Sequence, residues 1–127
     1  MPADLDGVRV FVVEDEFLLG IALEEDLKAA GCVVLGPFRS LAQASEAART
    51  EAFDLAILDV NLAGELVYPL AEELMARGKP FVFLSGYGAA DMPDRFRAVR
   101  RLSKPHDAAL LLQEMRNAQA GGMGEAR

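Results

Sequence analysis

Short, uniformly apolar runs alternate along the chain with longer segments in which apolar residues recur every three or four positions. The short runs lie at residues 8–13, 32–35, 55–58 and 81–84, with a weaker one at 98–102. Runs of Val, Ile, Leu and Phe without polar alternation are typical of strands that are covered on both faces. Strands that alternate with helices in this way indicate an α/β fold with a parallel sheet.

Helical patterns separate and follow these runs. One apolar stripe follows the first run and ends at a glycine, which favours a helix end. A second helix is predicted from Ser40, where Ser-Leu-Ala-Gln fits a capping box, to about Thr50. A third carries leucines four residues apart, and Asp107 is the predicted N-cap of the last helix. The residues that carry these patterns are Leu19, Leu23, Leu27, Ala30 and Gly31 in the first helix, Leu66, Leu70, Leu74, Gly78 and Pro80 in the third, and Leu111 and Met115 in the last.

Two segments depart from this regular alternation. Glycines on both sides of Tyr87 make the backbone permissive, and Pro93 would interrupt a helix, so the fourth helix of the fold is predicted to be short or irregular. Near the C-terminus the periodicity fades in residues 118–124. We therefore expect one domain at residues 1–118 and a flexible tail at residues 119–127.

The composition narrows the class of protein. The chain has 127 residues and a net charge of −7, which argues against nucleic acid as a partner because phosphate backbones are bound by basic surfaces. No apolar stretch approaches the roughly 18 residues of a membrane span, and the first residues do not resemble a signal peptide. The single cysteine, Cys32, lies in an apolar run and is expected to be a core thiol. We expect a soluble cytoplasmic protein with no membrane partner.

Reactive side chains stand where the apolar runs end. Glu14 and Asp15 follow the first run, Asp59 the third, Ser85 the fourth and Lys104 the weaker fifth. The carboxyl ends of parallel strands meet along one edge of a sheet, so these side chains should converge there. Crowded carboxylates repel one another unless a cation is present or a proton is held. A cation, a carboxylate, a hydroxyl and an ammonium group together suit the handling of a phosphoryl group.

This pattern resembles the receiver domain of two-component response regulators over about residues 7–118. The shared motif is an acidic pair after the first strand, a central Asp, a Ser or Thr after the fourth strand and Lys-Pro after the fifth. Residues 80–87 are also similar to the Pro-Phe-x-Phe-Ala-Thr-Gly-Tyr signature of a subgroup of stand-alone receivers, with Leu84 and Ser85 replacing Ala and Thr. The resemblance implies a doubly wound, five-stranded parallel sheet of flavodoxin-like order 2-1-3-4-5.

The resemblance also implies roles for the acidic residues. Asp59 would be the phosphoacceptor. The alternative is an Asp at a strand end that caps a turn or a helix, which would be preferred for a lone Asp and is disfavoured by the other four residues of the motif. Mg²⁺ would be held by Asp15, Asp59 and the main-chain carbonyl of Asn61, and Glu14 would act through a bound water. Glu16 is interpreted instead as an acid in the first turn of a helix, where the helix dipole favours it.

Two further residues would contact the phosphoryl group in a protein of this family. Ser85 would donate a hydrogen bond to it once Asp59 is modified, and Lys104 would pair with Asp59 before transfer and with the phosphoryl group afterwards. In the family the bond between Lys104 and Pro105 is typically cis. The alternatives without a functional role are a Ser85 that forms a turn at the strand end and a Lys104 on the surface.

The position that usually carries a switch aromatic departs from the family. Three residues before Lys104 stands Arg101, so Tyr87 is the nearest aromatic candidate, and signalling is predicted to run through ordering of residues 86–96. Simple surface packing of Tyr87 remains an equal alternative. The nearby arginines form either a solvated face or a surface for an acidic partner, and His106 is interpreted as a loop residue. These arginines are Arg95, Arg97, Arg100 and Arg101.

The leading hypothesis is a single-domain response regulator that accepts a phosphoryl group from a histidine kinase or a histidine phosphotransfer protein. Its output would be binding of a downstream protein, or it would act as a phosphate sink. It would not be an enzyme beyond Mg²⁺-dependent self-phosphorylation and autodephosphorylation. One alternative is an aspartyl-nucleophile phosphatase, which Asn61 weakens because those enzymes carry a second Asp two residues after the nucleophile. The other is a pseudo-receiver that binds partners without phosphorylation.

Overall fold

A computed structural model describes residues 5–86 and 92–121 of the chain. The elements along the chain are β1 (Arg9–Val13), α1 (Phe17–Ala29), β2 (Val33–Phe38), α2 (Leu41–Thr50), β3 (Leu55–Asp59), β4 (Asn61–Leu62), β5 (Glu65–Leu66), α3 (Tyr68–Ala76), β6 (Phe81–Ser85), the 3₁₀ helix η1 (Asp94–Phe96), β7 (Arg101–Ser103) and α4 (Ala108–Gly121). Five strands form one parallel sheet in the order β2-β1-β3-β6-β7. Without the small β4–β5 hairpin this is the predicted order 2-1-3-4-5, so the predicted fold is confirmed.

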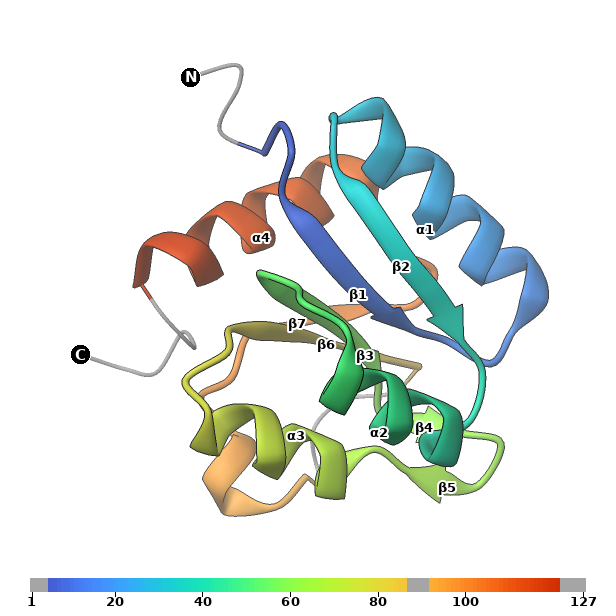
Figure 1. Cartoon of the computed structure of the whole chain (residues 1–127), viewed down its shortest axis with the longest axis vertical. Coiled ribbons are helices and arrows are strands. Elements are labelled where there is room, and N and C mark those ends of the chain that lie inside the picture. The colour runs from blue at the N-terminus through green and yellow to red at the C-terminus, as the bar shows by residue number, and fades with distance from the viewer. Residues whose placement is uncertain (1–4, 87–91, 122–127) are drawn as a thin grey trace.

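Helices cover both faces of the sheet (Figure 1). Helices α1 and α4 pack on one face, and α2, α3 and η1 pack on the other, so that two hydrophobic clusters are separated by the sheet. The central strand β3 is buried over its whole length, and β1 is buried except at its first residue. Uniformly apolar sequences form these two strands because neither of their faces meets water.

The second strand differs from the prediction in its length and its burial. It extends to Phe38 rather than ending at residue 35, and Val33 is 42% exposed, because β2 is an edge strand of the sheet. Gly36 adopts a φ of +101°, and a Cβ atom there would lie 2.6 Å from the carbonyl oxygen of Val12. Only glycine allows this close approach to β1. The peptide bond between Gly36 and Pro37 is cis.

The predicted helix starts are confirmed at Ser40 and Asp107. The amide of Gln43 donates to Ser40 Oγ at 3.1 Å, and the amide of Leu110 donates to Asp107 Oδ1 at 3.0 Å. The prediction for the third helix was wrong at its start, because Leu66 belongs to the β4–β5 hairpin and is 48% exposed. The hairpin places the start of α3 at Tyr68.

The last two elements also correct predicted boundaries. The fifth strand of the sheet is β7, Arg101–Ser103, rather than residues 98–102. Helix α4 continues to Gly121, past the domain boundary predicted at residue 118, because Ala118 is buried in the core and holds the end of the helix against the sheet. The remainder of the predicted tail, residues 122–127, lies outside the described part of the chain.

The segment between β6 and β7 was predicted to hold a short or irregular helix, and its described part agrees with that prediction. The helix seen there is the single 3₁₀ turn η1, which begins after Pro93 and buries Phe96 in the core. Cys32 is a buried thiol, also as predicted, and burial together with the nearby charge of Asp6 raises its pKa. Within residues 5–86 and 92–121, none of the helices combines the length and the apolar character needed to cross a lipid bilayer.

Candidate functional site

The predicted site residues meet at the carboxyl edge of the sheet. Glu14 and Asp15 directly follow β1, Asp59 is the last residue of β3, Ser85 is the last residue of β6, and Lys104 follows β7. The strands are in a parallel register that brings their ends to one edge. Side chains that are far apart in the sequence therefore lie within reach of one another, as the strand-end pattern predicted.

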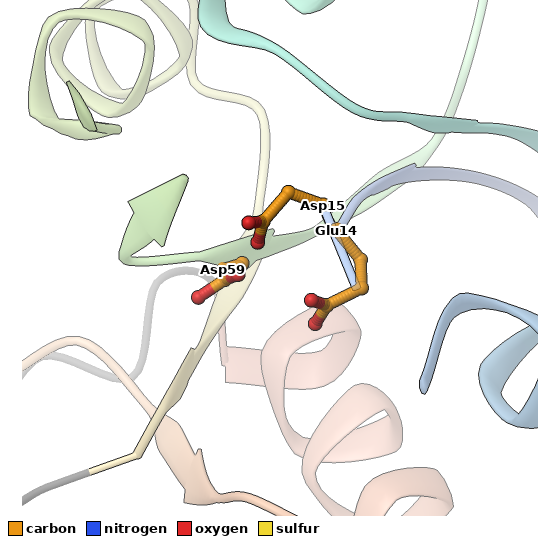
Figure 2. A group of neighbouring side chains, drawn as sticks. All are labelled: Glu14, Asp15 and Asp59. Atoms are coloured by element: carbon orange, nitrogen blue, oxygen red, sulfur yellow. The ribbon is translucent and has the colours of Figure 1, made fainter. Parts of the chain in front are cut away.

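Three carboxylates form the centre of this edge (Figure 2). Glu14, Asp15 and Asp59 each offer one oxygen, and these oxygens lie within 4.8 Å of one another. Glu14 and Asp59 are only 1% and 2% exposed. Negative charges held this close with little water to screen them require a cation, a proton or a positively charged side chain.

Lys104 supplies positive charge to the cluster. Its Nζ donates to Asp59 Oδ2 at 2.9 Å and to Glu14 Oε2 at 3.2 Å. This is the pairing with Asp59 that the resemblance implied. Glu16, interpreted from the sequence only as a helix-start acid, also places its Oε1 3.7 Å from Lys104 Nζ. Because the Glu16 side chain is 61% exposed, water screens this contact and it contributes little.

The protonation of Asp59 reflects its environment. Burial raises the pKa of Asp59 from its ordinary value of 3.8 to about 8, and hydrogen bonding with Asp15 and the charge of Glu14 act in the same direction, against the lowering effect of Lys104. Burial acts to lower the pKa of Lys104, but hydrogen bonds and charge from Asp59 and Glu14 raise it overall. In the absence of a cation, Asp59 therefore retains a proton near neutral pH while Lys104 stays charged.

The carboxylates fit a hard divalent cation. Glu14 Oε2 accepts hydrogen bonds from Lys104 and from the amide of Glu16 at 3.0 Å, whereas the buried Glu14 Oε1 has no hydrogen-bond partner within residues 5–86 and 92–121. A buried acceptor without a donor is costly, and a water on a neighbouring cation would satisfy it. Carboxylate oxygens combined with water are the ligands that Mg²⁺ prefers, so the donor set fits this ion.

Asn61 lies directly after the central carboxylate. Its amide N–H donates to Asp59 Oδ1 at 3.2 Å, which orients that side chain, and its Oδ1 accepts from the amide of Gly64 at 2.6 Å inside the β4–β5 hairpin. The side-chain oxygen is thus engaged in the turn. A contribution of Asn61 to a metal would come from its main-chain carbonyl, as the resemblance implied.

An open cleft of about 470 Å³ leads to Asp59. Its polar side is formed by Glu16, Asp59, Asn61, Ser85 and Lys104, and its apolar side by Val60, Leu66, Tyr68 and Met92. The apolar side was missed by the sequence reasoning, which considered only residues at the ends of the apolar runs. A signal was available in Tyr68-Pro69, because proline is favoured in the first turn of a helix and Tyr68 directly precedes it.

The two predicted switch residues have different outcomes. Tyr87 lies outside the described residues, so its role stays a prediction. Arg101 is exposed at the start of β7, and its Nη1 donates to the carbonyl oxygens of Arg97 at 3.1 Å and Val99 at 3.4 Å. The guanidinium therefore ties β7 to the turn before it, and the part of Arg101 in switching or partner binding stays a prediction.

The neighbouring arginines pair with acidic residues of the same chain. Arg95 contacts Glu72, Arg97 Nε lies 2.9 Å from Asp94 Oδ1, and Arg100 Nη1 lies 3.1 Å from Glu114 Oε1. These ion pairs reduce the positive charge that the surface presents, which favours the interpretation as a solvated face over a surface for an acidic partner.

The segment after Lys104 is held against helix α1. The Lys104-Pro105 peptide bond is cis, as the resemblance implied. His106 Nε2 lies 2.6 Å from Asp26 Oδ2, and the His106 side chain is only 5% exposed. His106 is a loop residue, as interpreted from the sequence, and its side chain also makes a part-buried contact with α1.

Comparison with known proteins places the chain in a family. No protein-family model and no curated protein matches the sequence. Among solved structures, SdrG from Sphingomonas melonis Fr1 is 34% identical with a TM-score of 0.78, covering 87% of this chain and 94% of SdrG. A structure of the BeF3-activated conformation of SdrG, from Pseudomonas melonis Fr1, is 35% identical with a TM-score of 0.72, over 84% of this chain and 94% of that one.

Other similar structures are receiver domains. The signal receiver domain of a modulated diguanylate cyclase from Desulfovibrio desulfuricans G20 is 27% identical with a TM-score of 0.81, covering 91% of this chain and 95% of that domain. The receiver domain of the PhyR response regulator from Erythrobacter litoralis shares the fold, with a TM-score of 0.77 at 21% identity over 96% of each chain. The chain therefore belongs to the receiver domains of response regulators.

Proposed function

We propose that this receiver accepts a phosphoryl group on Asp59 from a phosphohistidine of a histidine kinase or a histidine phosphotransfer protein. The observation that carries the proposal is the buried constellation around Asp59. Lys104 Nζ lies 2.9 Å from Asp59 Oδ2, and oxygens of Glu14, Asp15 and Asp59 lie within 4.8 Å of one another. A buried Asp that needed only to cap a turn would not require two further carboxylates and an ammonium group.

The chemistry follows from these positions. An oxygen of Asp59 attacks the phosphorus of the donor, the bond from phosphorus to the histidine nitrogen breaks, and that nitrogen keeps the bonding electrons. Mg²⁺ bound by Asp15, Asp59, the Asn61 carbonyl and, through water, Glu14 would neutralise the charge that develops on the phosphoryl oxygens. Lys104 moves from the carboxylate to a phosphoryl oxygen, and Ser85, which lines the same cleft, donates to another.

The activated conformation of a similar protein supports the same chemistry. SdrG, which is 35% identical, has a conformation described as BeF3-activated. Beryllium trifluoride on a carboxylate oxygen has the tetrahedral shape of a phosphoryl group, so an aspartyl phosphate is the matching state for this chain.

The output proposed here is a switch rather than turnover of a substrate. Phosphorylation adds about −1.5 to −2 charge at neutral pH, which recruits Lys104 and Ser85 and biases the segment between β6 and β7. The modified receiver then binds a downstream protein, or it serves as a phosphate sink for the kinase. Apart from Mg²⁺-dependent self-phosphorylation and autodephosphorylation, it has no enzymatic activity in this proposal.

The test is modification by a small phosphodonor. Wild-type protein incubated with acetyl phosphate and Mg²⁺ should gain one phosphate by mass spectrometry, and chelation of Mg²⁺ should prevent it. Asp59→Asn should abolish the gain. Asp54→Asn is the matched control, because Asp54 lies just before the same strand and accepts from the Arg9 amide away from the site. Unmodified wild type, or phosphate that persists in Asp59→Asn, would refute the proposal.

A further inference from the structure

The cleft that leads to Asp59 has an apolar wall that phosphoryl chemistry alone does not explain. Leu66, Tyr68 and Met92 line the same cleft of about 470 Å³ as Asp59 and Lys104. The phosphoryl oxygens need hydrogen-bond donors, and a hydrated cation needs oxygen ligands. An aromatic ring supplies neither of these in useful form. The wall therefore points to a flat, weakly polar group attached to the phosphorus.

The ring of Tyr68 is held in one orientation. It stacks on Phe96 with the ring centroids 5.2 Å apart and an interplanar angle of 16°, and it meets Phe83 edge-on at 6.0 Å. Phe83 and Phe96 are fully buried, whereas Tyr68 is half-buried. Two core rings thus fix Tyr68, and the part of it that remains uncovered lines the cleft.

The β4–β5 hairpin places a second apolar side chain on this wall. The hairpin begins two residues after Asp59, and Leu66 at its end is 48% exposed. A leucine that the core does not cover contributes little to folding where it stands. At the rim of this cleft it can instead cover a ring that enters toward Asp59.

We propose that Tyr68, supported by Leu66, forms a subsite for the imidazole ring of the phosphohistidine donor. Tyr68 is thereby a determinant of donor specificity. This inference rests on the proposed function. During transfer the phosphorus–nitrogen bond breaks while an Asp59 oxygen bonds to phosphorus, the bonding pair stays on the ring nitrogen, and that nitrogen takes up a proton from solvent. Tyr68 takes no part in these bond changes and acts by contact with the ring.

The inference is tested with two donors that share a phosphorus–nitrogen bond and differ in the ring. Monophosphoimidazole carries the ring, whereas phosphoramidate releases ammonia. Rates of phosphorylation per unit donor concentration are measured for both with Mg²⁺, and their ratio is compared between variants. Tyr68→Ala should lower the ratio of monophosphoimidazole to phosphoramidate by about three- to tenfold, the range of an aromatic contact. Tyr68→Phe, which keeps the ring, should leave the ratio unchanged.

Two further variants separate ring contact from damage to the fold. Leu66→Ala removes an exposed side chain and should lower the ratio by about twofold. Leu110→Ala is the matched control, because Leu110 is 56% exposed on α4 and does not line the cleft. An unchanged ratio in both Tyr68→Ala and Leu66→Ala, or equal slowing with both donors, would overturn the subsite alone. Wild type that accepts phosphate from neither donor would overturn the proposed function as well.

Discussion

The site divides into a central half, the carboxylates of Glu14, Asp15 and Asp59, and an edge half, Lys104. The two halves stand on different parts of the sheet. The carboxylates follow β1 and β3, central strands in which four of five and five of five residues are buried. Lys104 follows β7, a three-residue edge strand in which only Leu102 is buried. The buried centre of the sheet therefore positions the carboxylates, and the edge of the sheet positions Lys104.

This difference separates two physical requirements. Carboxylates that repel one another stay together only where a packed core holds their strands, and the same burial maintains the raised pKa of Asp59. In the proposed function, Lys104 changes partners when a phosphoryl group arrives, and it follows the short edge strand β7. A short edge strand loses fewer contacts when it shifts, because local opening costs least where few apolar groups are buried.

The largest effect is expected where the two halves meet. Lys104→Met should lower the free energy of unfolding by about 2–4 kcal/mol at pH 8, because it leaves Glu14 and Asp59 buried without their counter-charge. The loss should shrink at about pH 5, where Asp59 is neutral. Chemical denaturation followed by circular dichroism measures both values.

Lys28→Met is the control for this prediction. Lys28 is 61% exposed and pairs with Glu24 on the surface of α1, so its removal should cost less than about 0.5 kcal/mol. Equal losses for Lys104→Met and Lys28→Met would show that Lys104 does not link the core half to the edge half.

The next effect concerns the central half alone. Asp15→Asn should weaken Mg²⁺ binding at least about tenfold, because it removes one of the carboxylates that gather within 4.8 Å. Isothermal titration calorimetry measures the dissociation constant, with Asp54→Asn as the control that keeps wild-type affinity. If Asp15→Asn binds Mg²⁺ with wild-type affinity, the ion is not bound by the carboxylates of the central half.

The pH dependence of stability tests the environment of Asp59, in the same central half. Asp59 has a pKa of about 8 in the folded protein against an ordinary value of 3.8, so the folded protein holds a proton that the unfolded chain releases between these values. The stabilising contribution is complete below about pH 4 and is lost as the pH rises toward 8. Relative to Asp59→Asn, metal-free wild type should lose at least about 1 kcal/mol between pH 5 and 8.

Added Mg²⁺ provides the control for this pH effect. At pH 8 the ion should restore stability to the wild type and not to Asp59→Asn, because it replaces the proton on Asp59. Denaturant titrations with Mg²⁺ and with a chelator measure the difference. Parallel stability profiles for wild type and Asp59→Asn would contradict the raised pKa.

The smallest effect is expected at the edge. Arg101→Ala removes hydrogen bonds to two main-chain carbonyls on the surface and should cost about 1 kcal/mol or less of unfolding free energy. The rate of phosphorylation by acetyl phosphate should stay within about twofold of wild type, since the guanidinium contacts none of the carboxylates. Arg49→Ala on α2, which removes an exposed ion pair, is the control. A loss above about 2 kcal/mol would show that the edge is as rigid as the centre.

The sequence by itself determined the α/β class and the residues at the strand ends. Uniform apolar runs can be read without tertiary information, because a strand buried on both faces excludes polar residues. The side chains that follow those runs lie at one edge in any parallel sheet. For this reason Glu14, Asp15, Asp59, Ser85 and Lys104 were identified from their positions alone.

Only the tertiary structure decided which partners these residues have and what surrounds them. Strand positions in the sheet made β2 an edge strand, and the part-buried contact between His106 and Asp26 joins residues 80 positions apart. The raised pKa of Asp59 and the apolar wall at Tyr68 arise in the same way. Burial and long-range contact depend on how the layers pack in three dimensions, and no local pattern in the chain encodes that packing.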